Sequence, residues 1–174
     1  MSYSPIRTKR LQLRAPTTGD GAKLLPILST DDVGTTLGMH ATDESEASAL
    51  IEQISGYSWV MVVVDSGEVV GLVLMSVDAA SSSAEIGFAV GRAWRQRGFA
   101  TEGVRAVTDY AFTQTSLARV GGRAVPTNVA SIKVLTAVGL KRISERAGLG
   151  PSFKMQHGYS ISRDEWDRLA RSGN

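Results

Sequence analysis

Apolar and polar residues alternate along several segments in the first half of the chain, and this pattern predicts β-strands. Residues 9–14 read Lys-Arg-Leu-Gln-Leu-Arg, in which two leucines alternate with polar side chains as in a half-buried strand. Residues 57–64 and 68–77 are rich in β-branched residues and flank a short Asp-Ser-Gly turn, which is typical of a hairpin. Residues 84–90 alternate again. We therefore expect three consecutive strands joined as one meander.

A helical spacing marks other segments. In residues 99–113 apolar side chains recur every three or four positions, which predicts an amphipathic helix. Capping residues, glycines and apolar runs predict the remaining elements: helices at about 18–29 and 43–55, a strand at 118–125, a helix from Asn128 to Gly139, strands at 140–147 and 153–161 around a turn at 148–151, and a short helix after Ser162. The order β-α-α-β-β-β-α-β-α-β-β, before that last helix, fits a single α/β or α+β domain over residues 1–174.

Composition narrows the class of protein. The 174 residues suit one compact domain, and the contents of 43% hydrophobic and 21% charged residues are ordinary for a globular protein. The sequence has no apolar run long enough to cross a bilayer, and residues 1–14 lack the apolar centre of a secretory signal. The absence of cysteine excludes disulfides, thiolate metal sites and cysteine nucleophiles, and it is consistent with a cytoplasmic location.

Charge and histidine content argue against some partners. The formal net charge of +2 is too small to indicate nucleic acid, and no aromatic-basic stacking pattern occurs, so we expect neither a nucleic-acid nor a membrane partner. The two histidines, His40 and His157, are far apart in the sequence, and we expect no metal site.

Residues 95–103 read Arg-Gln-Arg-Gly-Phe-Ala-Thr-Glu-Gly and place a basic turn of low bulk where a helix begins. A helix start leaves backbone N–H groups unpaired and carries a partial positive charge, so small residues there allow an anion, usually a phosphate, to approach the backbone. The alternative is an exposed helix start whose arginines serve solubility and turn geometry. Neither the Gly-x-x-x-x-Gly-Lys-Ser/Thr loop nor the Gly-x-Gly-x-x-Gly fingerprint is present.

The turn also resembles a known signature. Residues 95–100 match the Gln/Arg-x-x-Gly-x-Gly/Ala motif of the GNAT acetyltransferase superfamily. Residues 8–14, 84–103 and 128–140 are similar to the branch that acetylates the N-terminal amines of ribosomal proteins, and the resemblance covers about residues 7–168. It implies an α+β fold, with a central, mixed but mostly antiparallel, twisted sheet of about seven strands flanked by helices in a single domain.

The resemblance implies a site for acetyl-CoA as co-substrate. The end of the strand at 84–90 would pair its backbone with the pantetheine arm, the basic turn would bind the pyrophosphate, Asn128 would contact pantetheine, and Ser131 would lie near the thioester sulfur. The residues expected to bind acetyl-CoA are Phe88, Ala89, Val90, Arg95, Gln96, Arg97, Gly98, Phe99, Ala100, Thr101, Asn128 and Ser131.

Acetyl transfer to an amine by direct attack in a ternary complex needs a base, a polarised carbonyl and a proton for the leaving thiolate. Glu85 is the candidate base, because strand alternation puts it on the same face as Ala89, although a solvated carboxylate is the alternative and Glu145 is a weaker candidate. A backbone N–H near Val90 would polarise the carbonyl. Many superfamily members carry a tyrosine acid seven residues after the asparagine, where this chain has leucine, so Ser131 or a water would protonate the thiolate.

We therefore expect an acetyl-CoA-dependent N-acetyltransferase that acts on a primary amine. A protein N-terminus and a small-molecule amine both remain possible acceptors, as do acetyl and a slightly longer acyl group, and the enzyme would be a monomer or a homodimer. The alternative function is a non-catalytic acyl-CoA-binding sensor or scaffold, which would bind acetyl-CoA without amine-dependent turnover.

Overall fold

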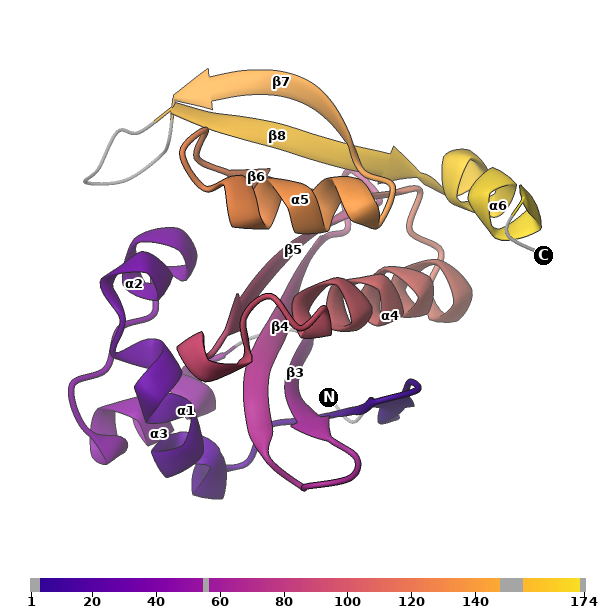
Figure 1. The fold of residues 1–174 in the computed structure, drawn as a ribbon. Coiled ribbons are helices and arrows are strands. Elements are labelled where there is room, and N and C mark those ends of the chain that lie inside the picture. The colour runs from indigo at the N-terminus through magenta and orange to yellow at the C-terminus, as the bar shows by residue number, and fades with distance from the viewer. Residues whose placement is uncertain (1–3, 55–56, 148–154, 173–174) are drawn as a thin grey trace.

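The computed structural model describes residues 4–54, 57–147 and 155–172, and it forms one twisted sheet flanked by helices (Figure 1). Within these ranges eight strands pair in the order β1-β2-β3-β4-β5-β6-β8-β7. The strands are β1 (Ile6–Arg7), β2 (Leu11–Arg14), β3 (Tyr57–Val63), β4 (Val69–Asp78), β5 (Ser83–Val90), β6 (Arg119–Ala124), β7 (Lys141–Ala147) and β8 (Met155–Ser162). The expected mostly antiparallel sheet is confirmed. The additional strand, β1, has two residues, too few to show an alternating pattern.

The helices follow the expected order with one addition. They are α1 (Gly21–Leu28), α2 (Asp31–Leu37), α3 (Glu44–Gln53), α4 (Phe99–Gln114), α5 (Val129–Ala137) and α6 (Arg163–Ser172), with 3₁₀ turns η1 (Thr18–Asp20) and η2 (Arg92–Trp94). The sequence missed α2 because its seven residues include a glycine and two threonines, which are poor helix formers. The turn predicted at 148–151 lies outside the described residues.

Alternation along the central strands builds a separate hydrophobic core on each face of the sheet. Trp59 and Met61 of β3 face the core that contains α4, whereas Val60 between them faces the core formed with α1, α2 and α3. The helix α4 approaches β3 closely, since a Cβ on its Gly103 would clash with the Met61 sulfur. The two helical layers therefore cover opposite faces of the same strands, and α4 runs across β3 and β4 in Figure 1.

The sheet parts in the middle, where its parallel strands meet. All described neighbours are antiparallel except β5 and β6, which pair in parallel over three residues, Ser83–Glu85 with Arg119–Gly121. Beyond Glu85, β5 continues to Val90 alongside β4, while β6 continues alongside β8. The second half of β5 therefore has one open edge.

Candidate functional site

A cavity of about 760 Å³ lies at this open edge. Its walls are the end of β5, the turn that leads into α4, the first residues of α5, and Val33 of α2. Every residue expected to bind acetyl-CoA lines this cavity except Arg97. The fold thus brings together three segments that are up to 43 positions apart, from Phe88 to Ser131.

The edge of β5 presents backbone groups to the cavity. The N–H of Gly91 donates to the carbonyl of Val70 in β4 at 3.0 Å. Because the backbone groups of successive strand residues point to opposite sides, those of Val90 and Phe88 point away from β4, toward the edge that β6 has left. The carbonyl of Val90 accepts a hydrogen bond from Nε of Arg95 at 3.1 Å, which leaves the Val90 N–H as a donor beside the cavity.

The start of α4 has the geometry of an anion site. Its N-cap residue is Gly98, with φ of 82°, and no side-chain cap is present at this helix start within the described chain. Gln96, two residues earlier, also has a positive φ, of 61°. The first N–H groups of a helix have no partner inside the helix, and the helix dipole adds a partial positive charge there. Successive N–H groups in such a turn form a concave anion-binding surface. Thr101 and Ala100, in the first turn, also line the cavity.

The start of α5 faces the same cavity but is closed by a side chain. Asn128 is the N-cap residue, and its Oδ1 accepts a hydrogen bond from the N–H of Ser131 at 3.0 Å. The Ser131 side chain is half-buried and lines the cavity. Asn128 therefore fixes the helix start that carries Ser131, and its Nδ2 group is the part of the amide left to contact a ligand.

The two arginines of the basic turn point in different directions. Arg95 lines the cavity, whereas Arg97 does not. The guanidinium of Arg97 lies over the ring of Trp94, 4.9 Å from its centroid. Its main-chain carbonyl accepts a hydrogen bond from Nη1 of Arg10 at 2.9 Å. The side chain of Arg97 therefore packs on Trp94, which lines the cavity, and is not itself part of the lining.

Glu85 lies on β5 but outside the lining of the cavity. Its carboxylate accepts hydrogen bonds from Nε of Arg123 on β6 at 2.8 and 2.9 Å, and both side chains are 45% exposed. These hydrogen bonds raise the pKa of Arg123 above its usual value, against the opposing effect of burial. Glu145 on β7 pairs with His157 on β8 in the strand register, and its side chain lies outside the described part of the structure.

A second, smaller cavity of about 220 Å³ lies one turn further along the same face of α2. Val33 of α2 lines the large cavity, and Leu37, one turn later, lines the small one. Leu37 also packs on β5, since a Cβ on Gly87 would lie 2.8 Å from its Cδ2. The small cavity is mostly apolar, with Ser76 of β4 opposite Glu85 in the strand register. This arrangement could not be expected from the sequence, because α2 was not among the predicted helices.

Of the side chains that the structure describes, no three or more histidines, aspartates or glutamates are grouped in a way that would hold a metal ion. None of the described helices combines the length and apolar character needed to span a membrane.

Comparisons with known proteins agree with this geometry. Residues 10–141 match the acetyltransferase (GNAT) domain family. The chain is 31% identical over 146 residues to the uncharacterized N-acetyltransferase p20 of Bacillus licheniformis, covering 79% of this chain and 82% of that protein. Among solved structures, a GNAT-family acetyltransferase from Bacillus anthracis superposes with a TM-score of 0.84 at 19% identity, over 92% of this chain and 99% of that one.

A further solved structure has the same fold. The ribosomal-protein-S5-alanine acetyltransferase from Vibrio fischeri superposes with a TM-score of 0.79 at 16% identity, over 94% of this chain and 99% of that one. Together, the matched domain over most of the chain, the N-acetyltransferase relative and the shared fold show that this chain is an N-acetyltransferase of the GNAT family.

Proposed function

We propose that the protein transfers the acetyl group of acetyl-CoA to a primary amine by direct attack in a ternary complex. The observation that carries the proposal is the large cavity, in which the open edge of β5 and the uncapped start of α4 present backbone N–H groups to one space. Its volume of about 760 Å³ falls in the range of small-molecule sites.

The residues around the cavity suit an acyl-CoA molecule. Arg95 and the first N–H groups of α4 would bind the pyrophosphate, and the backbone of Phe88 and Val90 would pair with the pantetheine arm. When bound, acetyl-CoA supplies an activated acetyl group as a thioester. The N–H of Val90 would donate to the thioester carbonyl oxygen as negative charge develops on it.

Ser131 and Glu85 are the proposed acid and base. The hydroxyl of Ser131 would donate a proton to the leaving sulfur, because the cap by Asn128 holds this side chain at the cavity wall. Glu85 would accept the amine proton through a water, since its carboxylate is bound to Arg123 and does not line the cavity.

The amine acceptor would approach from the side of α2. Val33 and Leu37, one turn apart on this helix, line the large and the small cavity respectively. The small cavity lies on the same face of the sheet as Glu85, and Ser76 is part of its lining. A protein N-terminus and a small-molecule amine both fit this route. The mostly apolar lining favours an acceptor that carries an apolar group next to its amine.

The test is the release of free thiol from acetyl-CoA in the presence of N-terminal peptides, polyamines or aminoglycosides. Because the chain has no cysteine, the protein adds no thiol background. We expect release that depends on one class of acceptor. Binding of acetyl-CoA by calorimetry with no release in any mixture would instead support the sensor or scaffold function.

Two variants separate enzyme from sensor. Glu85→Gln and Ser131→Ala should each lower kcat by roughly 10-fold or more, because each removes a proton-transfer group, while the Kd for acetyl-CoA stays within about 3-fold. Glu68→Gln, at an exposed carboxylate in the turn between β3 and β4, is the matched control and should leave kcat unchanged. An unchanged kcat in Glu85→Gln would remove Glu85 as the base, and an unchanged kcat in Ser131→Ala would remove Ser131 as the acid.

A further inference from the structure

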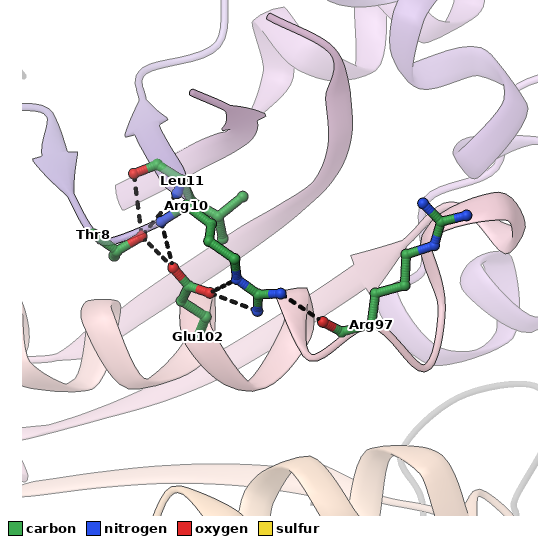
Figure 2. A network of polar contacts seen from close by, with 5 residues as sticks. All are labelled: Thr8, Arg10, Leu11, Arg97 and Glu102. Carbon is green, nitrogen blue, oxygen red and sulfur yellow. Dashed lines mark hydrogen bonds and ion pairs between the residues drawn. The ribbon is translucent and has the colours of Figure 1, made fainter. Parts of the chain in front are cut away.

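We propose that Arg10, which lies outside the cavity, is the positioning residue for its anion-binding turn. Arg10 precedes β2 and is separated from the turn by more than 80 residues, yet its side chain contacts both the turn and the first helical turn of α4 (Figure 2). This inference rests on the proposed function, since it assigns a role toward the pyrophosphate of acetyl-CoA.

Glu102 anchors the Arg10 side chain to α4. The Nε of Arg10 donates to Oε2 of Glu102 at 2.7 Å, and Nη2 of Arg10 lies 2.7 Å from the same oxygen. The other carboxylate oxygen of Glu102 accepts from the hydroxyl of Thr8 at 2.7 Å and from the main-chain N–H of Arg10 at 2.9 Å. Both carboxylate oxygens are thus bound to the segment before β2, as Figure 2 shows.

The charge of Glu102 is favoured in this environment. Its side chain is 17% exposed. Burial raises the pKa of the carboxyl, but the hydrogen bonds from Thr8 and Arg10 outweigh burial and hold the pKa below its usual value. A charged carboxylate in the first turn of a helix also interacts favourably with the helix dipole. The anchor is therefore charged and fully hydrogen-bonded at neutral pH.

From this anchor the guanidinium contacts the residues on both sides of Gly98. Nη1 donates to the carbonyl of Arg97 at 2.9 Å, and the guanidinium carbon lies 4.6 Å from the centroid of the Phe99 ring. A Cβ on Gly98 would lie 3.2 Å from Nη2. Arg10 therefore packs along the outer side of the turn, and the cavity lies on the side lined by Gly98 and Gln96.

The hydrogen bond to Arg97 fixes the direction of a backbone donor. In a trans peptide unit the C=O of one residue and the N–H of the next lie in one plane and point in opposite directions. The structure has no cis peptide bond among the described residues. Holding the carbonyl of Arg97 toward Arg10 therefore directs the N–H of Gly98 away from Arg10, and Gly98 is one of the residues that line the cavity. Arg10 would preorganise this donor for the pyrophosphate without touching it.

The experiment compares Arg10→Lys with Arg14→Lys. Lysine keeps the charge but cannot bind the Glu102 carboxylate and the Arg97 carbonyl with one planar fork. Arg14 is the matched control, because on β2 it forms a similar two-armed ion pair with Asp20, at 2.7 Å for each arm, away from the turn. For each variant we would measure the Kd for coenzyme A by calorimetry, KM and kcat with acetyl-CoA, and Tm.

For Arg10→Lys we expect the Kd for coenzyme A and the KM for acetyl-CoA to rise about 10-fold, the effect of one lost charge-assisted hydrogen bond, with kcat within about 2-fold of wild type. The two variants should lower Tm by similar amounts, and Arg14→Lys should leave the Kd for coenzyme A unchanged. The proposal would be overturned by equal Kd values for coenzyme A in the wild type and Arg10→Lys, or by an equal loss of coenzyme A affinity in Arg10→Lys and Arg14→Lys. Coenzyme A binding without turnover in the wild type would overturn the proposed function alone, and no binding would overturn both.

Discussion

Two helices begin at the same cavity, and their first turns are built in opposite ways. At α5 the side chain of Asn128 accepts a hydrogen bond from the N–H of Ser131, so one of the first N–H groups of this helix is already paired within the protein. At α4 the N-cap residue is Gly98, with no side-chain cap within the described chain. A side-chain cap stabilises a helix because it satisfies one of the unpaired N–H groups. The α4 start lacks that stabilisation, and in the proposed function its N–H groups would bind the ligand.

This difference suits two distinct roles of the two helices in the proposed site. In the proposed function the capped helix would contribute through side chains, above all the Ser131 hydroxyl, while the uncapped helix would contribute through its backbone. The uncapped turn must then be held in shape from outside, and the contacts of Arg10 with Glu102, Arg97 and Phe99 provide that support.

The largest effect should come from adding bulk to the uncapped start. In Gly98→Val, a β-branched residue at φ of 82° is strained, and its Cβ would lie 3.2 Å from Arg10. The turn should shift, and the loss of one or two charge-assisted hydrogen bonds predicts a Kd for acetyl-CoA about 30-fold higher or more. Isothermal calorimetry would measure it.

The matched control is Gly67→Val. Gly67 has a similar φ of 71°, in the turn between β3 and β4, and a Cβ there meets nothing within 4 Å. It should carry a similar backbone strain and leave the Kd unchanged. If the two variants lose equal stability and neither loses affinity, the α4 start is an ordinary glycine turn.

A smaller effect should separate the two arginines of the turn. Arg95→Ala should raise the Kd for acetyl-CoA about 10-fold, because Arg95 lines the cavity and loses a charge-assisted contact. Arg97→Ala should raise the Kd less than about 3-fold, since this guanidinium packs on Trp94 and does not line the cavity itself. Titrations at two salt concentrations would check the ranking, and a larger effect from Arg97 would contradict the geometry.

The smallest effect should come from opening the capped start. Asn128→Ala removes the hydrogen bond to the Ser131 N–H and should lower the free energy of unfolding by about 1 kcal/mol. Asn128→Ser keeps a capping oxygen and should recover most of that loss. Urea denaturation of both variants measures the free energy of unfolding. Equal losses of this free energy in Asn128→Ala and Asn128→Ser would show that Asn128 does not stabilise the protein through the cap.

The sequence predicts these two helix starts well because both signals are local. Gly98 at the start of a periodic apolar segment and Asn128 before another are recognisable within four or five residues. The central strands are equally local, since β-branched residues and alternation mark β3, β4 and β5. A short, weakly helical segment such as α2 depends instead on packing against β5, which no local pattern records.

The supports of the site are not local, and this is why the sequence did not reveal them. Arg10 and Glu102 are 92 positions apart, and nothing in either neighbourhood indicates the other. Composition likewise could not tell that Arg95 lines the cavity while Arg97 packs on Trp94, because the outcome depends on one backbone turn. The pairing of Glu85 with Arg123 similarly requires β5 and β6 to be placed side by side.

The parting of β5 from β6 gives the ligand a structural part to play. Over its last five residues β5 has an open main-chain edge, the kind of edge to which another strand can add by backbone hydrogen bonds. An extended pantetheine arm lying along this edge would act as a temporary strand, bonded to Phe88 and Val90, between the two halves of the sheet. Each catalytic cycle would then complete the sheet on binding and open it again on release, so product departure would resemble the peeling away of an edge strand.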